Sequence, residues 1–143
     1  MTVTPVPVVI VNWNAGSALL ECLDSLFGSH SGLDLDVVLV DNASDDGSGV
    51  EAALRFPQVR LVANIDNRGF AAAVNQGLAC IGSSCSYVLV LNPDTRFSMD
   101  SLGPLIGFME SNPDAAACGP AVIGRDGGLQ RGCRRREPSA WGM

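Results

Sequence analysis

Four short apolar runs, each followed at once by an amide or a carboxylate, constrain the fold of this 143-residue chain more than any other feature. The runs cover residues 8–11, 37–40, 60–63 and 88–91. Short, valine-rich runs are typical of strands buried on both faces, as in a parallel sheet. Because parallel strands point the same way, the polar residues that follow them lie along one edge. In an open α/β sheet this edge holds the ligand, where the strand order reverses.

Helical patterns fill the spaces between these runs, so we predict an α/β fold with a doubly wound, mostly parallel sheet and right-handed crossovers. We expect helices at residues 17–27, 49–56, 69–81 and 98–111, and a weaker fifth strand at residues 116–123. Residues 125–128 (Arg-Asp-Gly-Gly) predict a hairpin turn, with a return strand at residues 129–135. The length is that of one domain, residues 1–143. We expect this domain to be truncated at its C-terminus, because no closing helix follows Arg136.

Composition narrows the class of partner. Hydrophobic residues make up 47% of the chain and charged residues 17%, which indicates a packed soluble domain. Four arginines stand against thirteen acidic residues before position 125, and five arginines against two acidic residues from there on. An acidic domain with few aromatic residues argues against a nucleic-acid partner, so we interpret the arginine-rich end as a local anion site.

Cysteine usage and the N-terminus bear on location. The five cysteines lack the spacing of a metal site, which favours buried thiols in a reducing compartment. The first apolar run is too short for a signal core or a membrane span. We therefore expect a cytoplasmic protein, with peripheral contact at the inner face of the cell membrane left open.

Candidate ligand residues follow the first two strands. Asp41 ends the second strand, where a carboxylate can accept a hydrogen bond from a base N–H or a ribose hydroxyl, and Asn42 follows it. Asn12, Trp13 and Asn14 stand at the end of the neighbouring strand. Trp13 is either a packing aromatic or a platform on which a base stacks.

A further candidate segment, residues 64–77, is predicted to be a loop that leads into a helix. Gly69 allows the backbone to approach a ligand, and the helix N-terminus beside it is a natural anion site. Arg68 is a phosphate donor candidate, and Asn67 belongs to the same loop. Asn75, at mid-helix, is either a ligand contact or a surface residue.

The fourth strand leads into Asn92-Pro93-Asp94. A carboxylate just past a buried strand suits a hard cation such as Mg²⁺ or Mn²⁺, although an ordinary turn aspartate would look the same. The chain lacks both Gly-x-Gly-x-x-Gly after the first strand and the P-loop motif, which excludes the phosphate binding of dinucleotide dehydrogenases and P-loop enzymes. A nucleotidyltransferase is also disfavoured, because no Gly/Arg/Lys-rich loop follows the first strand.

Taken together, these segments resemble glycosyltransferase family 2, the inverting enzymes of GT-A fold, and especially its rhamnosyltransferase-like members. The matching stretches are residues 9–14, 40–48, 67–77, 91–95 and 127–130, followed by residues 134–139. The resemblance implies a Rossmann-like nucleotide-binding half, a nucleoside diphosphate sugar and a divalent metal, Mg²⁺ or Mn²⁺. It implies that Asp41 contacts the base and that Asp94, the last residue of the Asp-x-Asp motif, ligates the metal. Asn92 replaces the first aspartate and can still accept from a ribose hydroxyl.

The implied reaction transfers a sugar, such as rhamnose, to a glycan or lipid-linked acceptor in cell wall or polysaccharide biosynthesis. The family's catalytic base lies C-terminal to everything in this chain, so we assign no catalytic residue. We expect the donor-binding half of a metal-dependent glycosyltransferase. The alternative is a non-catalytic nucleotide-sugar-binding or interaction domain that lacks the base. A truncated sheet would leave an unpaired edge, which favours self-association.

Overall fold

The computed structural model describes residues 5–29, 32–82, 85–124 and 126–130. The chain forms two compact units, residues 1–102 and residues 103–143. The matching stretch at residues 134–139 and most of the predicted return strand lie outside the described residues.

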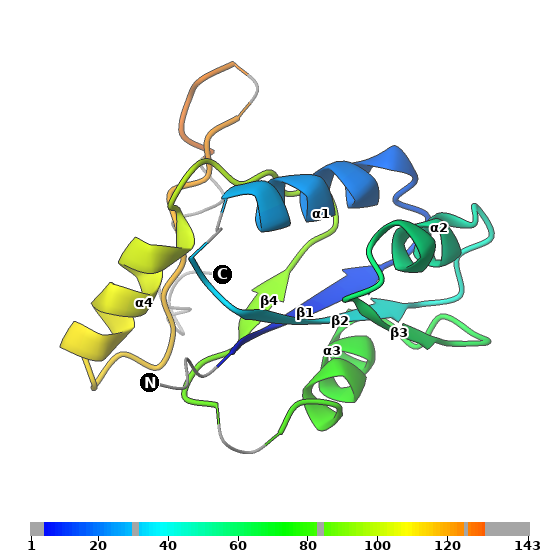
Figure 1. Ribbon diagram of the computed structural model, residues 1–143, viewed down its shortest axis with the longest axis horizontal. Coiled ribbons are helices and arrows are strands. Elements are labelled where there is room, and N and C mark those ends of the chain that lie inside the picture. Colours follow the sequence, from blue (N-terminus) through cyan, green and yellow to red (C-terminus); the bar gives the residue numbers. More distant parts are fainter. Residues whose placement is uncertain (1–4, 30–31, 83–84, 125, 131–143) are drawn as a thin grey trace, which may run out of the picture. The chain divides into compact units, whose positions relative to one another are not determined.

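The first unit is built on a four-stranded, entirely parallel sheet (Figure 1). Its strands are β1 (Val6–Asn12), β2 (Leu35–Asp41), β3 (Arg60–Ala63) and β4 (Leu89–Leu91). They lie in the order β3-β2-β1-β4. This arrangement confirms the four predicted strands and the α/β class. The order reverses between β1 and β4, because β2 and β3 are added on one side of β1 and β4 on the other.

Three helices cover the two faces of this sheet: α1 (Ser17–Ser29), α2 (Ser48–Arg55) and α3 (Phe70–Ala79). The connections from β1 to β2 and from β2 to β3 run in the same direction across the sheet. Because such crossovers are right-handed, they place α1 and α2 on the same face. The crossover from β3 to β4 runs in the opposite direction and places α3 on the other face. Figure 1 shows this division, with α1 and α2 on one side of the sheet and α3 on the other.

The core of the first unit lies at the centre of the sheet. Residues 8–11 of β1 and residues 37–40 of β2 are all buried, as predicted for strands covered on both faces. On the α3 side the packing is close, since a Cβ built on Gly77 would lie 2.4 Å from Val9 Cγ1. Only glycine fits at that point of the helix.

Helix α4 (Leu102–Ser111) begins four residues later than predicted. Asp100 has a φ of 54°, which lies outside the right-handed helical region and delays the start of the helix. Pro104 falls in the first turn of α4, where its missing N–H removes no intrahelical hydrogen bond.

The predicted strand at residues 116–123 is wrong. Over residues 103–124 and 126–130, strand pairing is limited to an isolated antiparallel bridge between Ile123 and Leu129. Pro120 has no N–H to offer a ladder, and Gly119 before it weakens a strand further. A turn does close nearby, because the Gly124 N–H donates to the Gly128 carbonyl at 2.8 Å. No helix in the described part of the chain is long and apolar enough to cross a membrane.

Candidate functional site

The ends of β1 and β2 bring Asn12 and Asp41 together. The two residues are register partners in the sheet, and both side chains lie on the face that α2 covers. A Cβ built on Gly49 of α2 would lie 2.7 Å from Asp41 Cγ, so the helix backbone approaches the carboxylate closely. Asn12 is completely buried, whereas Asp41 is half-buried.

Hydrogen bonds hold the Asp41 carboxylate in one orientation. Its Oδ1 accepts from Asn12 Nδ2 at 2.7 Å and from Ser44 Oγ at 2.6 Å. Its Oδ2 accepts from the Ser44 N–H at 3.3 Å. The Asn12 amide also lies 2.8 Å from Ser48 Oγ, at the start of α2. The carboxylate is therefore fixed between β1 and the N-terminus of α2.

The loops that follow β1 and β2 are tied to each other. The Asn14 N–H donates to Ser44 Oγ at 3.0 Å, and Asn14 Oδ1 accepts from the Asp45 N–H at 2.9 Å. Trp13, between the two asparagines of the β1 loop, is 60% exposed. The aromatic ring is thus accessible at the edge of the sheet, while the loop backbone around it is held.

Asp46 links the same two loops at a second point. Its carboxylate accepts from the Gly16 N–H at 2.8 Å, and from the Ser48 hydroxyl at 2.6 Å and N–H at 2.9 Å. These bonds, the Ser48 hydroxyl first among them, lower the pKa of Asp46 below its ordinary value of 3.8. The carboxylate is therefore ionised at neutral pH and keeps all three hydrogen bonds.

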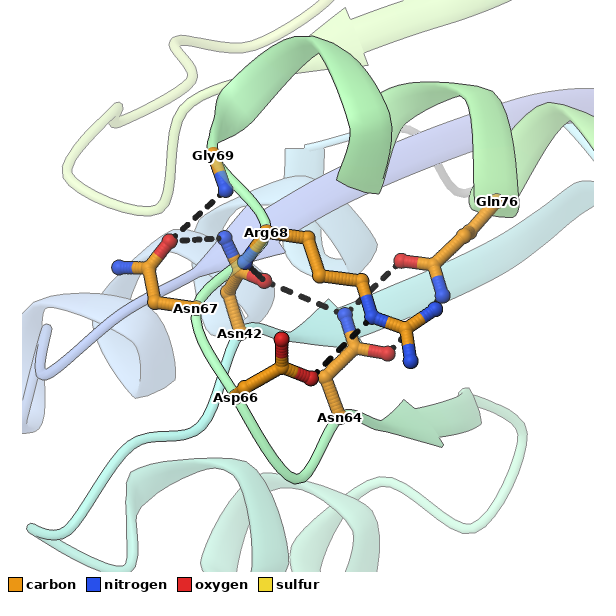
Figure 2. A network of polar contacts seen from close by, with 7 residues as sticks. All are labelled: Asn42, Asn64, Asp66, Asn67, Arg68, Gly69 and Gln76. Carbon is orange, nitrogen blue, oxygen red and sulfur yellow. Dashed lines mark hydrogen bonds and ion pairs between the residues drawn. The ribbon is translucent and has the colours of Figure 1, made fainter.

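A second network of amides occupies the other face of the same edge (Figure 2). Asn42 follows Asp41 and its side chain is directed to the opposite side, as successive residues of a strand are. Asn42 is 2% exposed, and its Nδ2 donates to Asn67 Oδ1 at 2.8 Å. Its Oδ1 accepts from the Arg68 N–H at 3.0 Å and from Asn64 Nδ2 at 3.2 Å. Asn42 therefore anchors the loop before α3 to the end of β2.

The loop continues into α3 through a glycine. Gly69 has a φ of 78°, which other residues adopt only with strain, and its N–H donates to Asn67 Oδ1 at 2.9 Å. The Arg68 guanidinium is half exposed, and its Nε forms a direct, solvent-exposed ion pair with Asp66 Oδ1 at 3.3 Å. The charged head of Arg68 is thus accessible, while its backbone is fixed by Asn42.

Asn64 and Gln76 form a reciprocal amide pair, with hydrogen bonds of 2.8 and 2.9 Å, that joins the end of β3 to α3 (Figure 2). Asn75, for which the sequence left open a nucleotide contact or a surface position, is exposed on the same helix. The neighbouring Gln76 makes the inward contact instead.

This difference gives a matched pair of variants. We expect Gln76→Ala to lower the free energy of unfolding by about 1–2 kcal/mol, because it leaves the half-buried Asn64 amide without its partner. Asn75→Ala should change the free energy of unfolding by less than about 0.5 kcal/mol. Urea unfolding of the two variants measures the difference. Equal effects would contradict a special role for the amide pair.

Asp94 and Asn92 follow β4, and both are exposed. The Asn92 carbonyl accepts a weak hydrogen bond from Cys22 Sγ at 3.7 Å. Burial raises the pKa of Cys22 to about 12, so the thiol stays neutral beside this turn. The turn that carries Asp94 is thereby supported from α1 without adding another charge.

The residues after β4 supply too few donor atoms to hold a cation such as Mg²⁺ alone, but they can hold one together with a phosphate ligand. Within the described ranges, no group of three or more His, Cys, Asp or Glu side chains is arranged to hold a metal. Asp94 offers one hard, accessible carboxylate, and Asn92 offers an amide oxygen. Mg²⁺ commonly binds through one or two carboxylates together with phosphate oxygens and water, which suits this donor set.

Asp41 is the last residue of β2, and Asp94 lies in the turn that follows β4; these two strands flank β1. The point between β1 and β4 is where the strand order reverses, and ligands of open α/β sheets bind at such a point.

The predicted site residues thus fall into three groups. The first surrounds Asp41 and includes Asn12 and Asn14, the second surrounds Asn42, and the third is the turn after β4. The sequence analysis placed Asn64 after the third strand, but it predicted none of the contacts by which the first two groups are supported: those of Ser44, Ser48, Gly49, Asn64 and Gln76. The ligand roles of the predicted residues stay predictions.

Comparison with known proteins identifies the family. The model of the family described as Glycosyl transferase family 2 matches residues 8–141. The chain is 32% identical over 138 residues to N-acetylglucosaminyl-diphospho-decaprenol L-rhamnosyltransferase of Mycobacterium tuberculosis, a match that covers 90% of this chain and 45% of that protein. It is 30% identical over 125 residues to the succinoglycan biosynthesis protein ExoO of Rhizobium meliloti, covering 87% of this chain and 34% of that protein.

Among solved structures, S. aureus TarS (residues 1–349) in complex with UDP-GlcNAc matches with a TM-score of 0.66 at 18% identity. The match covers 77% of this chain and 32% of that chain, and at this identity it shows the fold alone. The present chain spans less than half the length of the two curated relatives. Because the family match extends over nearly all of the sequence, the chain belongs to glycosyl transferase family 2.

Proposed function

We propose that this chain is the donor-binding half of an inverting, metal-dependent glycosyltransferase. The observation that carries the proposal is the position of Asp41 at the end of β2 and of Asp94 in the turn after β4, next to the two strands that flank β1, in a chain of family 2. The donor is a nucleoside diphosphate sugar and the acceptor a glycan or a lipid-linked sugar of cell wall or polysaccharide biosynthesis. The likeness to a rhamnosyltransferase supports rhamnose as the sugar. We place the protein in the cytoplasm, in peripheral contact with the membrane that carries such an acceptor.

Each group of residues has a role in this proposal. Asp41 accepts a hydrogen bond from the base, and the exposed Trp13 ring stacks on it. Arg68 donates to the diphosphate, for which its planar guanidinium is suited. Asp94, with Asn92, would hold Mg²⁺ or Mn²⁺ on the diphosphate. A bound cation supplies neutralisation of the charge that grows on the leaving phosphate.

The proposed reaction is an in-line displacement at the anomeric carbon. The acceptor oxygen forms a bond to that carbon, and the bond from the carbon to the phosphate oxygen breaks on the opposite side. The nucleoside diphosphate leaves with the electron pair, and the acceptor proton passes to a carboxylate base. We assign this base to no residue of the present chain.

Calorimetry tests the donor-binding role. We expect the chain to bind UDP, dTDP or GDP in the presence of Mg²⁺ or Mn²⁺, and to bind the same nucleotide more weakly in EDTA. Absence of metal-dependent binding of all three would contradict the proposal. A transfer or donor-hydrolysis assay on the same sample then separates an active enzyme from a binding domain, because turnover would exclude a purely non-catalytic role.

A further inference from the structure

We propose that Asn12 is a positioning residue. It holds Oδ1 of the Asp41 carboxylate, so that the other oxygen, Oδ2, accepts a hydrogen bond from a nucleotide base that carries a ring N–H. This inference rests on the proposed function, because it assumes that the site binds a nucleotide. It replaces the direct ligand contact that the sequence suggested for Asn12.

Asp41 Oδ1 is fully occupied by protein donors. This oxygen accepts two short hydrogen bonds, from Asn12 Nδ2 at 2.7 Å and Ser44 Oγ at 2.6 Å. A carboxylate oxygen has two lone pairs, so these two donors use its full capacity. The backbone of Gly49 also closes over it, since a Cβ there would lie 3.0 Å from Oδ1. Oδ1 is therefore committed to the protein.

The second oxygen, Oδ2, is left with spare capacity. It accepts from the Ser44 N–H at 3.3 Å, which is a long hydrogen bond. Asp41 is half-buried rather than enclosed, so a ligand can reach its carboxylate. The asymmetry between the two oxygens makes Oδ2 the acceptor available to a ligand.

Burying the Asn12 amide carries a cost in stability. Its side chain is completely buried, so it cannot touch a ligand directly. Its Oδ1 has no hydrogen-bond partner among the described residues, which destabilises the fold compared with an apolar side chain. Its Nδ2, in contrast, reaches Asp41, Ser44 and Ser48. The role of the buried amide is therefore to hold the Asp41 carboxylate and the two serine hydroxyls through its nitrogen.

A fixed carboxylate oxygen selects among bases. Uracil and thymine carry a donor N–H at N3 and guanine carries one at N1, whereas the corresponding ring nitrogens of cytosine and adenine are acceptors. A site built to accept from a donor N–H rejects analogues that lack it more strongly than an apolar pocket could. The Asn12–Asp41 pair therefore favours a donor built on uracil, thymine or guanine.

The test compares each nucleotide with its ring-N-methylated analogue, which cannot donate to Asp41. The probes are UDP, dTDP and GDP with Mn²⁺, against N3-methyl-UDP, N3-methyl-dTDP and N1-methyl-GDP. We expect Asn12→Ala to weaken binding of the preferred unmethylated nucleotide about tenfold and to leave its methylated analogue unchanged. We also expect Asn12→Ala to cause no further loss in an Asp41→Asn background. Leu54→Ala, on the exposed side of α2, is the control variant.

An equal loss for the methylated and unmethylated nucleotides would overturn the inference, because Asn12 would then act on folding alone. If Asn12→Ala does not fold, Ser44→Ala removes the other Oδ1 donor and should show the same selective loss. If the wild type binds none of the nucleotides, the proposed function itself fails, and this inference with it. Binding by the wild type with no penalty for methylation would refute the inference while leaving the proposed function intact.

Discussion

Asp94→Ala is expected to remove the metal-dependent part of nucleotide binding. In Mn²⁺ the affinity for the nucleotide should fall on the order of 100-fold. Replacing residues that only support a metal ligand already lowers metal affinity or activity about 10–100-fold. The physical reason is that Asp94 is an exposed carboxylate in the turn after β4, where a cation on the diphosphate would need a protein oxygen. Calorimetry with the preferred nucleotide, in Mn²⁺ and in EDTA, measures the effect. In EDTA the variant and the wild type should bind equally weakly.

Asp34→Ala is the matched control for this prediction. Asp34 is also an exposed aspartate of the first unit, but it precedes β2 and so lies at the opposite edge of the sheet. Both variants remove one negative charge from an acidic chain, and a general electrostatic effect would change both alike. We expect nucleotide binding by Asp34→Ala to match that of the wild type. Retained metal dependence in Asp94→Ala would refute the assignment of Asp94 as the metal ligand.

The sheet could be predicted from the sequence because its signal is local. β1 and β2 are short valine-rich runs and are buried as predicted, whereas β3 and β4 are only partly buried; the residue after each run marks the edge where the strand ends. The position of Asp41 and Asp94 at one edge follows from parallel strands alone. In the structure Asp41 ends β2 and Asp94 lies in the turn after β4, and these two strands flank β1.

Two features of the chain after β4 could not be predicted in the same way. The left-handed backbone of Asp100 delays α4, and nothing in the local hydrophobic pattern reveals that conformation. The apolar stretch at residues 116–123 has the composition of a strand but contains Pro120. Whether such a stretch becomes a strand depends on a partner that can accept it, and within the described residues its pairing is a single bridge between Ile123 and Leu129.

The sequence predicted where the site residues lie in the fold, but it did not predict which side chains they contact. The alternation along β1 shows that Asn12 lies on one face, yet the groups that enclose it come from Ser44 and α2, more than thirty residues later. In α3 a difference of one residue decides which amide faces inward, and Gln76 rather than Asn75 pairs with Asn64. Tertiary packing sets both outcomes.

Gly77→Ala is expected to be the most destabilising single-methyl change in the first unit. The new Cβ would lie 2.4 Å from Val9 Cγ1 and 3.4 Å from Val40 Cγ2, inside a fully buried interface. Valine side chains are stiff at χ1, so α3 must move away from the sheet rather than the valines rotating aside. Overpacking of this kind costs about 1–3 kcal/mol, which outweighs the helix propensity gained by alanine. Urea unfolding measures the loss.

Gly28→Ala separates this packing effect from helix propensity. Gly28 also lies in a helix of the first unit, α1, but a Cβ there meets nothing within 4 Å, so the same substitution should stabilise the protein by up to about 1 kcal/mol. Because α3 also carries Gln76 and follows directly from the Arg68 loop, its displacement in Gly77→Ala should weaken nucleotide binding as well as folding. A Gly77→Ala protein as stable as Gly28→Ala would mean that α3 does not lie against Val9, and the loop geometry that depends on this contact would fail with it.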